Sequence, residues 1–462
     1  MPDTKNNPNP YCEITPKILA LRAQWEAHNY IDPALYREYG VKRGLRDENG
    51  QGVLTGLTRV SEICAYTMDS QNRLCSQEGT LYYRGIDVRD LVKGSRERGR
   101  FGYEETAYLL LFGELPTAAQ LENFCSQLAS YRTLPSNFFR DVIMKGPNQD
   151  LMNSMQRSVL TLFCYDDRPN DIDLTNVLRQ NLQLIANFPV LAVYAYQACK
   201  AVKGESLFIH RPLPELSTAE NMLYMLREDH HYTDLEARAL DAALILHADN
   251  GGGNNSTFTN HVVTSSGTDT YAAVAASLSS LKGPRHGSAN SKVMEMMDDI
   301  ALHVMDWTDE TALRDYLSQI LAGDAFDGLG LLYGLGHAVY TTSDPRCEVF
   351  RQYVRRLSVE KGAEKRLALY ENVERIGKQL LTSRSRKEVS TNIDFYSGFA
   401  YELLGFPRAL YTPIFAVARI AGWSAHRMEE LSGGGKLIRP RYECVEPHRT
   451  YIPMGQRWEG SE

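Results

Sequence analysis

The stretch Lys282–Met294, KGPRHGSANSKVM, places one histidine, His286, in a short break between two segments of helical character. The upstream segment, TDTYAAVAASLSSLK, is rich in small and apolar residues, and Gly283 followed by Pro284 is a common way to end a helix. The downstream segment, ANSKVMEMMDDIALHVM, repeats apolar side chains at helical spacing. We therefore expect two helices that meet at His286.

His286 is expected at or just before the N-terminus of the second helix. Backbone N–H groups and the helix dipole disfavour a protonated imidazole there, so a neutral ring could donate one hydrogen bond to a substrate oxygen. The alternative is a histidine in a surface turn. His286 alone does not separate these two interpretations.

Helix signals of the same kind recur along the chain. Residues 217–228 and 233–250 each begin with Ser or Thr followed three residues later by Glu, which is the capping-box pattern. Asp344 and Thr412 each precede a proline, which indicates an N-cap before the first helical turn.

Strand signals are few and lie near the N-terminus, at residues 59–67 and 79–86. Residues 1–50 combine a helical segment, PKILALRAQWEAH, with polar linker, and the segment after SGGGK near the C-terminus has an extended character. The sequence therefore predicts a mainly α fold with little β structure.

Length, composition and charge exclude several classes of protein. The 462 residues are enough for one large domain and a smaller one. The net charge of −7, without a basic stripe, gives no reason to expect nucleic acid or an anionic membrane as a partner. No targeting segment and no apolar run of membrane-spanning length is visible. The eight scattered cysteines indicate reduced side chains, so we expect a cytoplasmic protein without a metal site.

Two glycine-rich stretches, NGGGNN (250–255) and GLGLLYGLG (328–336), do not fit phosphate-binding motifs. The first lacks the following Gly-Lys-Ser/Thr of a Walker loop. The second resembles a dinucleotide fingerprint, but it follows a helical, acidic stretch instead of a strand. A nicotinamide-dependent oxidoreductase is therefore not supported.

Four polar residues stand out from their surroundings. His337 follows a Gly-x-Gly turn. Arg346 lies in the first turn of a helix, where a cation is unfavourable unless it binds an anion, and the alternative is a solvated side chain. Asp394 begins an otherwise apolar helix, either as an N-cap or as a carboxylate base. Arg419 lies on a nearly all-apolar helix, so it must bind a ligand carboxylate, form an internal ion pair or snorkel.

Together these segments resemble the citrate synthase family. The order HADN, GPRHGSAN, GLGHAVY, DPR, NIDFYSG, FAVARIAGWSAH and IRPR follows the landmarks of that family over residues 55–445, and YRGIDVRDL and ETAYLLLFGELPT match its early helices. Several independent motifs in one order are more specific than any single motif. The resemblance implies condensation of acetyl-CoA with oxaloacetate and water to citrate and CoA, a step of the tricarboxylic acid cycle, without a bound cofactor.

The resemblance also implies roles for individual residues. Asp394 would remove a proton from the methyl group of acetyl-CoA, His286 would hydrogen-bond the thioester oxygen, and His337 would donate to the ketone of oxaloacetate. Arg346 and Arg419 would bind the carboxylates of oxaloacetate. The remaining implied contacts are those of Arg439 from the other subunit with oxaloacetate, and those of Leu335, Gly336 and Asn392 with CoA.

The same resemblance implies a citrate synthase-like two-domain multi-helical fold and a homodimer with shared active sites. Residues 1–50 would form an N-terminal extension. Residues 51–285 together with 405–462 would form a large helical domain. Residues 286–404 would form a small helical domain that closes over the large one and excludes water.

One position departs from the family pattern. Many relatives have His-x-Asp-His where this chain has His247-Ala-Asp249-Asn250. Asn250 would still donate a hydrogen bond to oxaloacetate but carries no charge, which leaves the substrate preference open. His247, at the end of an apolar helix, is either a site residue or a structural histidine.

Two other functions stay open. A 2-methylcitrate synthase would use propionyl-CoA, which differs from acetyl-CoA by one methylene, and an apolar pocket discriminates such a difference by only about 1–3 kcal/mol. A helical binding protein without catalysis is an alternative from another class. The presence of Asp394, His286 and His337 argues against it.

Overall fold

The computed structural model describes residues 12–47, 51–68, 74–336, 340–385 and 388–457. Helices dominate the described chain, and its strands form one three-stranded antiparallel sheet, so the predicted mainly α fold is confirmed. The α-helices are α1 Pro16–His28, α2 Ala34–Glu38, α3 Val88–Glu97, α4 Tyr103–Phe112, α5 Ala118–Tyr131, α6 Leu151–Leu162, α7 Leu174–Val202, α8 Thr218–Leu226, α9 Asp234–His247, α10 Asn255–Ser265, α11 Thr270–Leu281, α12 Ala289–His303, α13 Glu310–Ala322, α14 Pro345–Glu360, α15 Glu364–Ser385, α16 Asp394–Leu403 and α17 Tyr411–Ser432. The strands are β1 Ser61–Met68, β2 Leu74–Tyr83 and β3 Ile86–Asp87.

Three of the four helix starts predicted from capping patterns are confirmed. Ser217 and Thr233 form complete capping boxes at the starts of α8 and α9. Asp344 is the N-cap of α14, and its carboxylate accepts a hydrogen bond from the backbone N–H of Arg346 (3.0 Å).

The prediction that Thr412 is an N-cap is wrong. The short 3₁₀ turn Arg408–Leu410 runs directly into α17, which begins at Tyr411, so Thr412 already lies inside the helix. Its hydroxyl donates to the backbone carbonyl of Gly287 instead (3.3 Å). A Thr-Pro pair fits the first turn of a helix as well as the position before it.

The core of the body is built around α17, which packs against α4, α7, α9 and α10. Among the described residues, α7 has the length and composition of a membrane span, but 83% of its most apolar window is buried inside the fold. This burial is typical of the core helix of a globular protein. Like α7, the helix α17 is deeply buried, and Arg419 lies on it.

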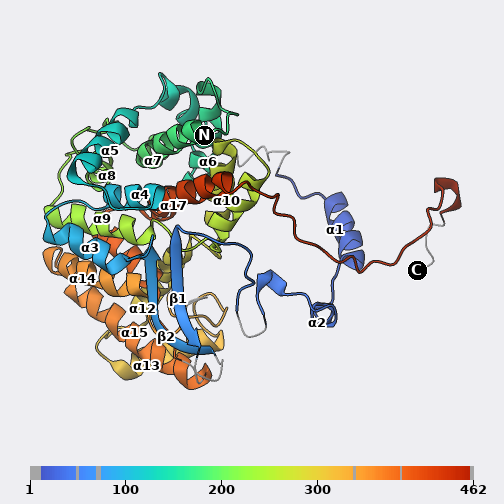
Figure 1. Cartoon of the computed structure of the whole chain (residues 1–462). Helices are drawn as coiled ribbons and strands as arrows, with labels where there is room; N and C mark the ends of the chain where they lie inside the picture. The colour runs from blue at the N-terminus through green and yellow to red at the C-terminus, as the bar shows by residue number, and fades with distance from the viewer. Residues whose placement is uncertain (1–11, 48–50, 69–73, 337–339, 386–387, 458–462) are drawn as a thin grey trace.

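A hairpin of β1 and β2 runs along the part of the body that contains α12–α15 (Figure 1). Its two strands pair antiparallel from Ser61 with Tyr83 to Met68 with Leu74, and β2 contacts α14. Both strand predictions are confirmed, although β2 begins five residues before the predicted range.

Both ends of the described chain leave the body on the same side (Figure 1). The helices α1 and α2 contain no buried residue, and the segment after α17 is extended and mostly exposed, as predicted. The predicted division at residues 286 and 404 into a large and a small domain stays a prediction.

Candidate active site

Four of the predicted site residues influence one another electrostatically in the folded chain. Asp394 is the first residue of α16, Arg346 is the second residue of α14, Arg419 lies within α17, and His286 lies just before α12. The charges of Arg346 and Arg419 both act on Asp394, and the charge of Arg419 acts on His286. The starts of three helices therefore meet α17 at one site.

Asp394 is half-buried at the start of α16. Burial raises the pKa of its carboxyl group to about 6, although Arg346 and Arg419 favour the ionised form. The N-cap position of α16 belongs to Ile393, and within the described residues the Asp394 carboxylate accepts no hydrogen bond. The N-cap interpretation of Asp394 is therefore wrong, and its role as a general base stays a prediction.

Asp344 joins two of the site's helices. Its carboxylate accepts hydrogen bonds from the guanidinium of Arg346 (2.8 Å) and from the backbone N–H of Ile393 (3.1 Å), the residue before Asp394. Burial disfavours the charge of Arg346, but Asp344, Tyr340 and Asp394 together outweigh this effect and raise its pKa. Arg346 is therefore a permanent, buried cation and not a solvated side chain.

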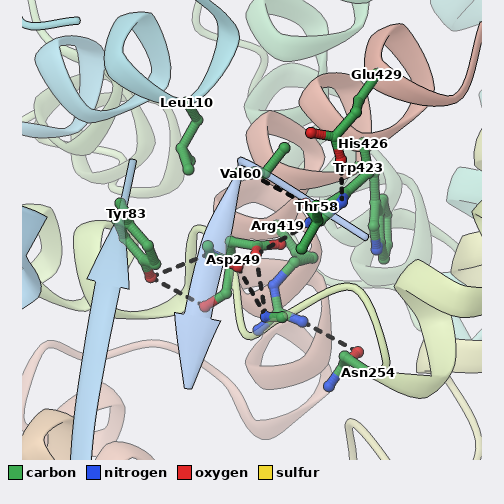
Figure 2. Close-up of polar contacts among 12 residues, drawn as sticks. Thr58, Val60, Tyr83, Leu110, Asp249, Asn254, Arg419, Trp423, His426 and Glu429 are labelled. Atoms are coloured by element: carbon green, nitrogen blue, oxygen red, sulfur yellow. Dashed lines mark hydrogen bonds and ion pairs between the residues drawn. The ribbon is translucent and has the colours of Figure 1, made fainter. Parts of the chain in front are cut away.

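Arg419 is completely buried on α17, and Figure 2 shows its guanidinium beside Asp249 and Asn254. Its Nε donates to the carbonyl of His247 (2.8 Å), one Nη donates to Oδ1 of Asn254 (3.2 Å), and the group lies over the ring of Phe415 (4.6 Å). Burial lowers the pKa of Arg419 to about 10, opposed first by Asp249. The side chain therefore remains a cation at neutral pH.

Three buried polar atoms on neighbouring residues lack a hydrogen-bond partner within the described residues. Burying an unpaired polar group is costly, and a bound polar ligand would pair all three; Oδ1 of Asp249 in the same turn and other buried atoms of the described fold also lack a partner. Burial and the two arginines lower the pKa of His247, so its ring is neutral. The three atoms are the second Nη of Arg419, Nδ1 of His247 and Oδ1 of Asn250.

The turn that carries Asn250 is held by its neighbour Asp249. The Asp249 carboxylate is fully buried and accepts hydrogen bonds from the hydroxyl of Ser61, the N–H of Gly251 (3.1 Å) and Nε2 of His426 (3.2 Å). Gly251 has φ +84°, a conformation that favours glycine. The turn that contains Asn250 is therefore held in place by the hydrogen bonds of Asp249.

His286 is half-buried, and its Nε2 lies 3.0 Å from the hydroxyl oxygen of Ser256. The same oxygen accepts the indole N–H of Trp423 (3.2 Å). Burial, followed by the charge of Arg419, lowers the pKa of His286 to about 4, so the ring is neutral at pH 7 and carries one N–H. The predicted position before a helix start is confirmed, since α12 begins at Ala289. The ring is fixed in the site and is not a free surface side chain.

A cavity of about 440 Å³ lies beside the second glycine-rich stretch. Of the three predicted CoA contacts, Leu335 and Gly336 line this cavity. Asn392 does not line it, but its amide donates to the carbonyl of Gly336 (2.8 Å) and accepts from the N–H of Asp394 (3.0 Å). Asn392 therefore connects the cavity to the carboxylate. Another cavity, of about 480 Å³ between α5, α6, α7 and α11, contains none of these residues.

Two predicted site residues are not placed in this group. Arg439 is exposed on the C-terminal segment and makes no hydrogen bond or ion pair with the site residues described above. The neighbouring Ile438 N–H is bound to the hydroxyl of Ser265 (3.1 Å). His337 lies outside the described residues.

The sequence patterns did not reveal the supporting residues of the site. Ser256 and Asn254 lie in the NGGGNNS stretch, whose glycines point to a phosphate loop and not to a support for His286 and Arg419. The pattern at Asp344 predicts only a helix cap, although its carboxylate also pairs with Arg346. A local signal is present in Asn254, Asn255 and Ser256, which follow the three glycines after HADN, because short polar side chains commonly begin a helix.

Comparisons with known proteins identify the family of the chain. A family model described as citrate synthase, C-terminal domain, matches residues 49–441. The citrate synthase of Synechocystis sp. is 32% identical over 382 residues, covering 82% of this chain and 89% of that protein. The protein named 2-methylcitrate synthase 2 of Corynebacterium glutamicum is 32% identical over 422 residues, covering 90% of this chain and 98% of that protein.

The solved structures show the same fold. A ternary complex of carboxymethyl coenzyme A and oxaloacetate with the citrate synthase of the archaeon Thermoplasma acidophilum has a TM-score of 0.73 and 27% identity, covering 90% of this chain and 99% of that chain. The family model and the named relatives define the enzyme class, an acyltransferase that converts the acyl group into an alkyl group on transfer. The chain belongs to the citrate synthase family.

Proposed function

We propose that the protein condenses acetyl-CoA with oxaloacetate and water, which yields citrate and CoA. The observation that carries the proposal is the site formed by Asp394, with a pKa of about 6, the neutral ring of His286 and the buried cation Arg419. A thioester methyl group is a very weak acid, so its deprotonation needs both a base and a donor at the developing enolate oxygen. A dicarboxylate substrate needs cations.

In the proposed first step, Asp394 takes a proton from the methyl group of acetyl-CoA while the N–H of His286 donates to the thioester oxygen. The enol carbon then attacks the ketone carbon of oxaloacetate. His337, which lies outside the described residues, protonates the ketone oxygen and so turns it into a hydroxyl group. Water finally hydrolyses the citryl-CoA thioester: its oxygen joins the acyl carbon to give citrate, and one of its protons leaves with the CoA thiol. The proton that Asp394 took replaces the one that His337 gave up.

Arg346 and Arg419 are proposed to bind the two carboxylates of oxaloacetate. The unpartnered Nη of Arg419 supports this role, because a bidentate carboxylate would satisfy it. Asn250 and His247 carry the other two unpartnered polar atoms, and both are neutral groups able to hydrogen-bond an oxygen-rich ligand.

The 440 Å³ cavity is proposed to receive part of CoA. Its lining combines apolar side chains with one cation, Arg384, whose guanidinium also donates to the carbonyl of Leu321 (2.9 Å). An arginine at such an opening would attract the phosphate groups of CoA. The connection through Asn392 would place the thioester end toward Asp394.

We also propose a homodimer in which Arg439 completes the site of the other subunit. Ile18, Leu19 and Trp25 of α1 are 51%, 53% and 62% exposed, and the segment 437–454 adds further exposed apolar side chains. An isolated helix of this length is marginal in water, so α1 needs a surface to pack on. A second subunit would supply that surface and bring Arg439 to a neighbouring site.

Two further properties are proposed on general grounds. The eight cysteines, all within the described residues, are free, which supports a reducing compartment such as the cytoplasm. The proposed chemistry is carried by acid, base and hydrogen-bonding groups, so it needs no bound cofactor. Condensation of acetyl-CoA with oxaloacetate would serve the tricarboxylic acid cycle.

The test is thiol release from acetyl-CoA and from propionyl-CoA, each with and without oxaloacetate. We expect oxaloacetate-dependent release with a higher kcat/KM for acetyl-CoA. Higher kcat/KM for propionyl-CoA would instead make the protein a 2-methylcitrate synthase, a candidate supported by a relative of that name at the same 32% identity. Absence of oxaloacetate-dependent release from both thioesters would refute both functions.

A further inference from the structure

Strand β2 passes so close to residues 340–343 that only glycine fits at position 79. A Cβ atom on Gly79 would lie 2.2 Å from the carbonyl oxygen of Ser343 and 2.5 Å from a ring carbon of Tyr340. Gly79 does not have a positive φ, so backbone conformation does not explain the glycine. A glycine within a strand commonly marks such a close approach of another backbone.

The close approach includes a hydrogen bond, from the N–H of Gly79 to the hydroxyl of Ser343 (3.2 Å). On the side away from β2, the segment 340–344 is hydrogen-bonded to residues that shortly precede the proposed base, Asp394. The carbonyl of Tyr340 accepts from the hydroxyl of Ser390 (2.9 Å), and Asp344 accepts from the N–H of Ile393 (3.1 Å). This segment therefore lies between β2 and the start of α16.

The same segment also fixes the cation Arg346. Its guanidinium pairs with Asp344 (2.8 Å) and lies over the ring of Tyr340 (5.6 Å). Any displacement of residues 340–344 away from β2 would move Arg346 and Asp394 together.

The C-terminal end of β2 contacts the opposite part of the site. Tyr83 is fully buried, and its hydroxyl donates to the carbonyl of Asp249 (3.0 Å) and accepts from the N–H of Asp249 (3.1 Å). Figure 2 shows these two contacts beside Arg419. Four residues of strand span about 13 Å, so Gly79 and Tyr83 connect the two parts of the site through one short, rigid element.

We propose that β2 is a stop against which residues 340–344 rest when the small domain predicted for residues 286–404 closes, so that it sets how closely Arg346 and Asp394 approach the Asp249–Asn250 turn, with Gly79 as a positioning residue. This inference rests on the proposed function, because it concerns the geometry of that same site. The hairpin takes no part in the chemistry itself; it acts only through the groups that it holds.

The test is Gly79→Ala. Its Cβ needs a separation of about 3.2 Å from the Ser343 oxygen, so the segment must retreat by about 1 Å, and a misplacement of this size can cost about 10²-fold in rate. We expect kcat/KM for oxaloacetate to fall about 10²-fold, with a higher KM and a lower kcat, because Arg346 and Asp394 both move. A merely structural role would lower the yield of folded enzyme without changing KM.

Two matched variants control for general strain. Gly94→Ala adds a methyl group where nothing lies within 4 Å, and Gly113→Ala adds one to a residue with φ +88° at the C-terminal end of α4, which strains the backbone without crowding any site residue. Both should keep the wild-type KM for oxaloacetate, even where Gly113→Ala lowers the melting temperature. Ser343→Ala tests the contact without adding atoms and should raise KM about 2- to 10-fold, the effect of one lost hydrogen bond.

The inference is overturned if wild-type enzyme releases thiol with oxaloacetate while Gly79→Ala and Ser343→Ala both keep its KM and kcat. It is also overturned if Gly113→Ala, at equal loss of melting temperature, shows the same kinetic change as Gly79→Ala. Because Ser343→Ala creates no clash, it decides the question even if Gly79→Ala does not fold. Absence of oxaloacetate-dependent release in the wild type would refute the proposed function and, with it, this inference.

Discussion

Replacing Asp394 by Asn should remove activity and at the same time stabilise the folded protein. An amide keeps the size of the side chain but cannot accept the methyl proton, so kcat should fall by about 10²–10⁴-fold. The gain in stability follows from the burial that raises the pKa of Asp394 from its ordinary 3.8 to about 6. At about 1.4 kcal/mol per pKa unit, the ionised carboxylate costs the folded state about 3 kcal/mol, and a neutral amide avoids this cost.

The stability gained by Asp394→Asn should be largest at high pH, because only the ionised carboxylate is costly to bury. Above pH 6 the Asp394 carboxyl is ionised in both the folded and the unfolded chain, so the full cost of about 3 kcal/mol is present. At pH 5 the folded form is largely protonated while the unfolded form is ionised, and about half of the cost remains. Below 3.8 both forms are protonated and the cost disappears.

The measurement is the free energy of unfolding in urea at pH 8 and pH 5, together with thiol release. Asp394→Asn should be more stable than wild type by about 3 kcal/mol at pH 8 and by about half as much at pH 5. Asp309→Asn is the control, since Asp309 is an exposed N-cap of α13 and Asn also caps helices. An Asp394→Asn protein that is active, or less stable than wild type at pH 8, would contradict the assignment of Asp394 as a buried base.

Four further outcomes are expected. Wild-type kcat/KM should fall about tenfold per pH unit below pH 6 as Asp394 becomes protonated, and a profile that stays flat to pH 5 would contradict the raised pKa. His286→Ala should lower kcat by about 10²–10³-fold, the effect of one lost donor at a developing oxyanion, whereas a change in KM alone would make His286 a binding residue. Arg419→Met keeps most of the buried volume but removes the charge, so the KM for oxaloacetate should rise at least about tenfold while the KM for acetyl-CoA stays the same; equal changes in both would indicate a disturbed fold. Arg439→Ala and Asp394→Ala, each inactive, should regain about a quarter of wild-type activity when reassembled as random dimers, because one site of each mixed dimer holds neither change. Verified mixed dimers without activity would show that Arg439 serves its own subunit.

The helices were predictable because their signals are local. The capping boxes at Ser217 and Thr233 satisfy backbone N–H groups within four residues, so the local sequence is enough to predict where these helices begin. The failures also have a local cause. At Thr412 and Asp394 the sequence has a suitable cap residue, but the preceding residues already adopt helical angles and the helix begins one residue earlier or at that residue itself.

The candidate site was only partly predictable. His286, Arg346, Asp394 and Arg419 are polar residues in apolar or Gly-rich surroundings, which marks them in the sequence. Their supporting residues are not marked in this way, because Asp344 is also an ordinary N-cap. Its second role depends on Ile393, 49 residues away, and no local pattern contains that contact.

The amino-acid sequence by itself determined the mainly α fold, the helix starts with local caps and the family motifs, because these depend on residues a few positions apart. Only the tertiary structure decided the chemical state of the site. Packing α17 into the core buries Arg419, and the meeting of α14 and α16 places Asp394 near two cations while removing it from water. The raised pKa of Asp394 and the lowered pKa of His286 arise from this burial, which is a property of contacts between distant segments and not of any one motif.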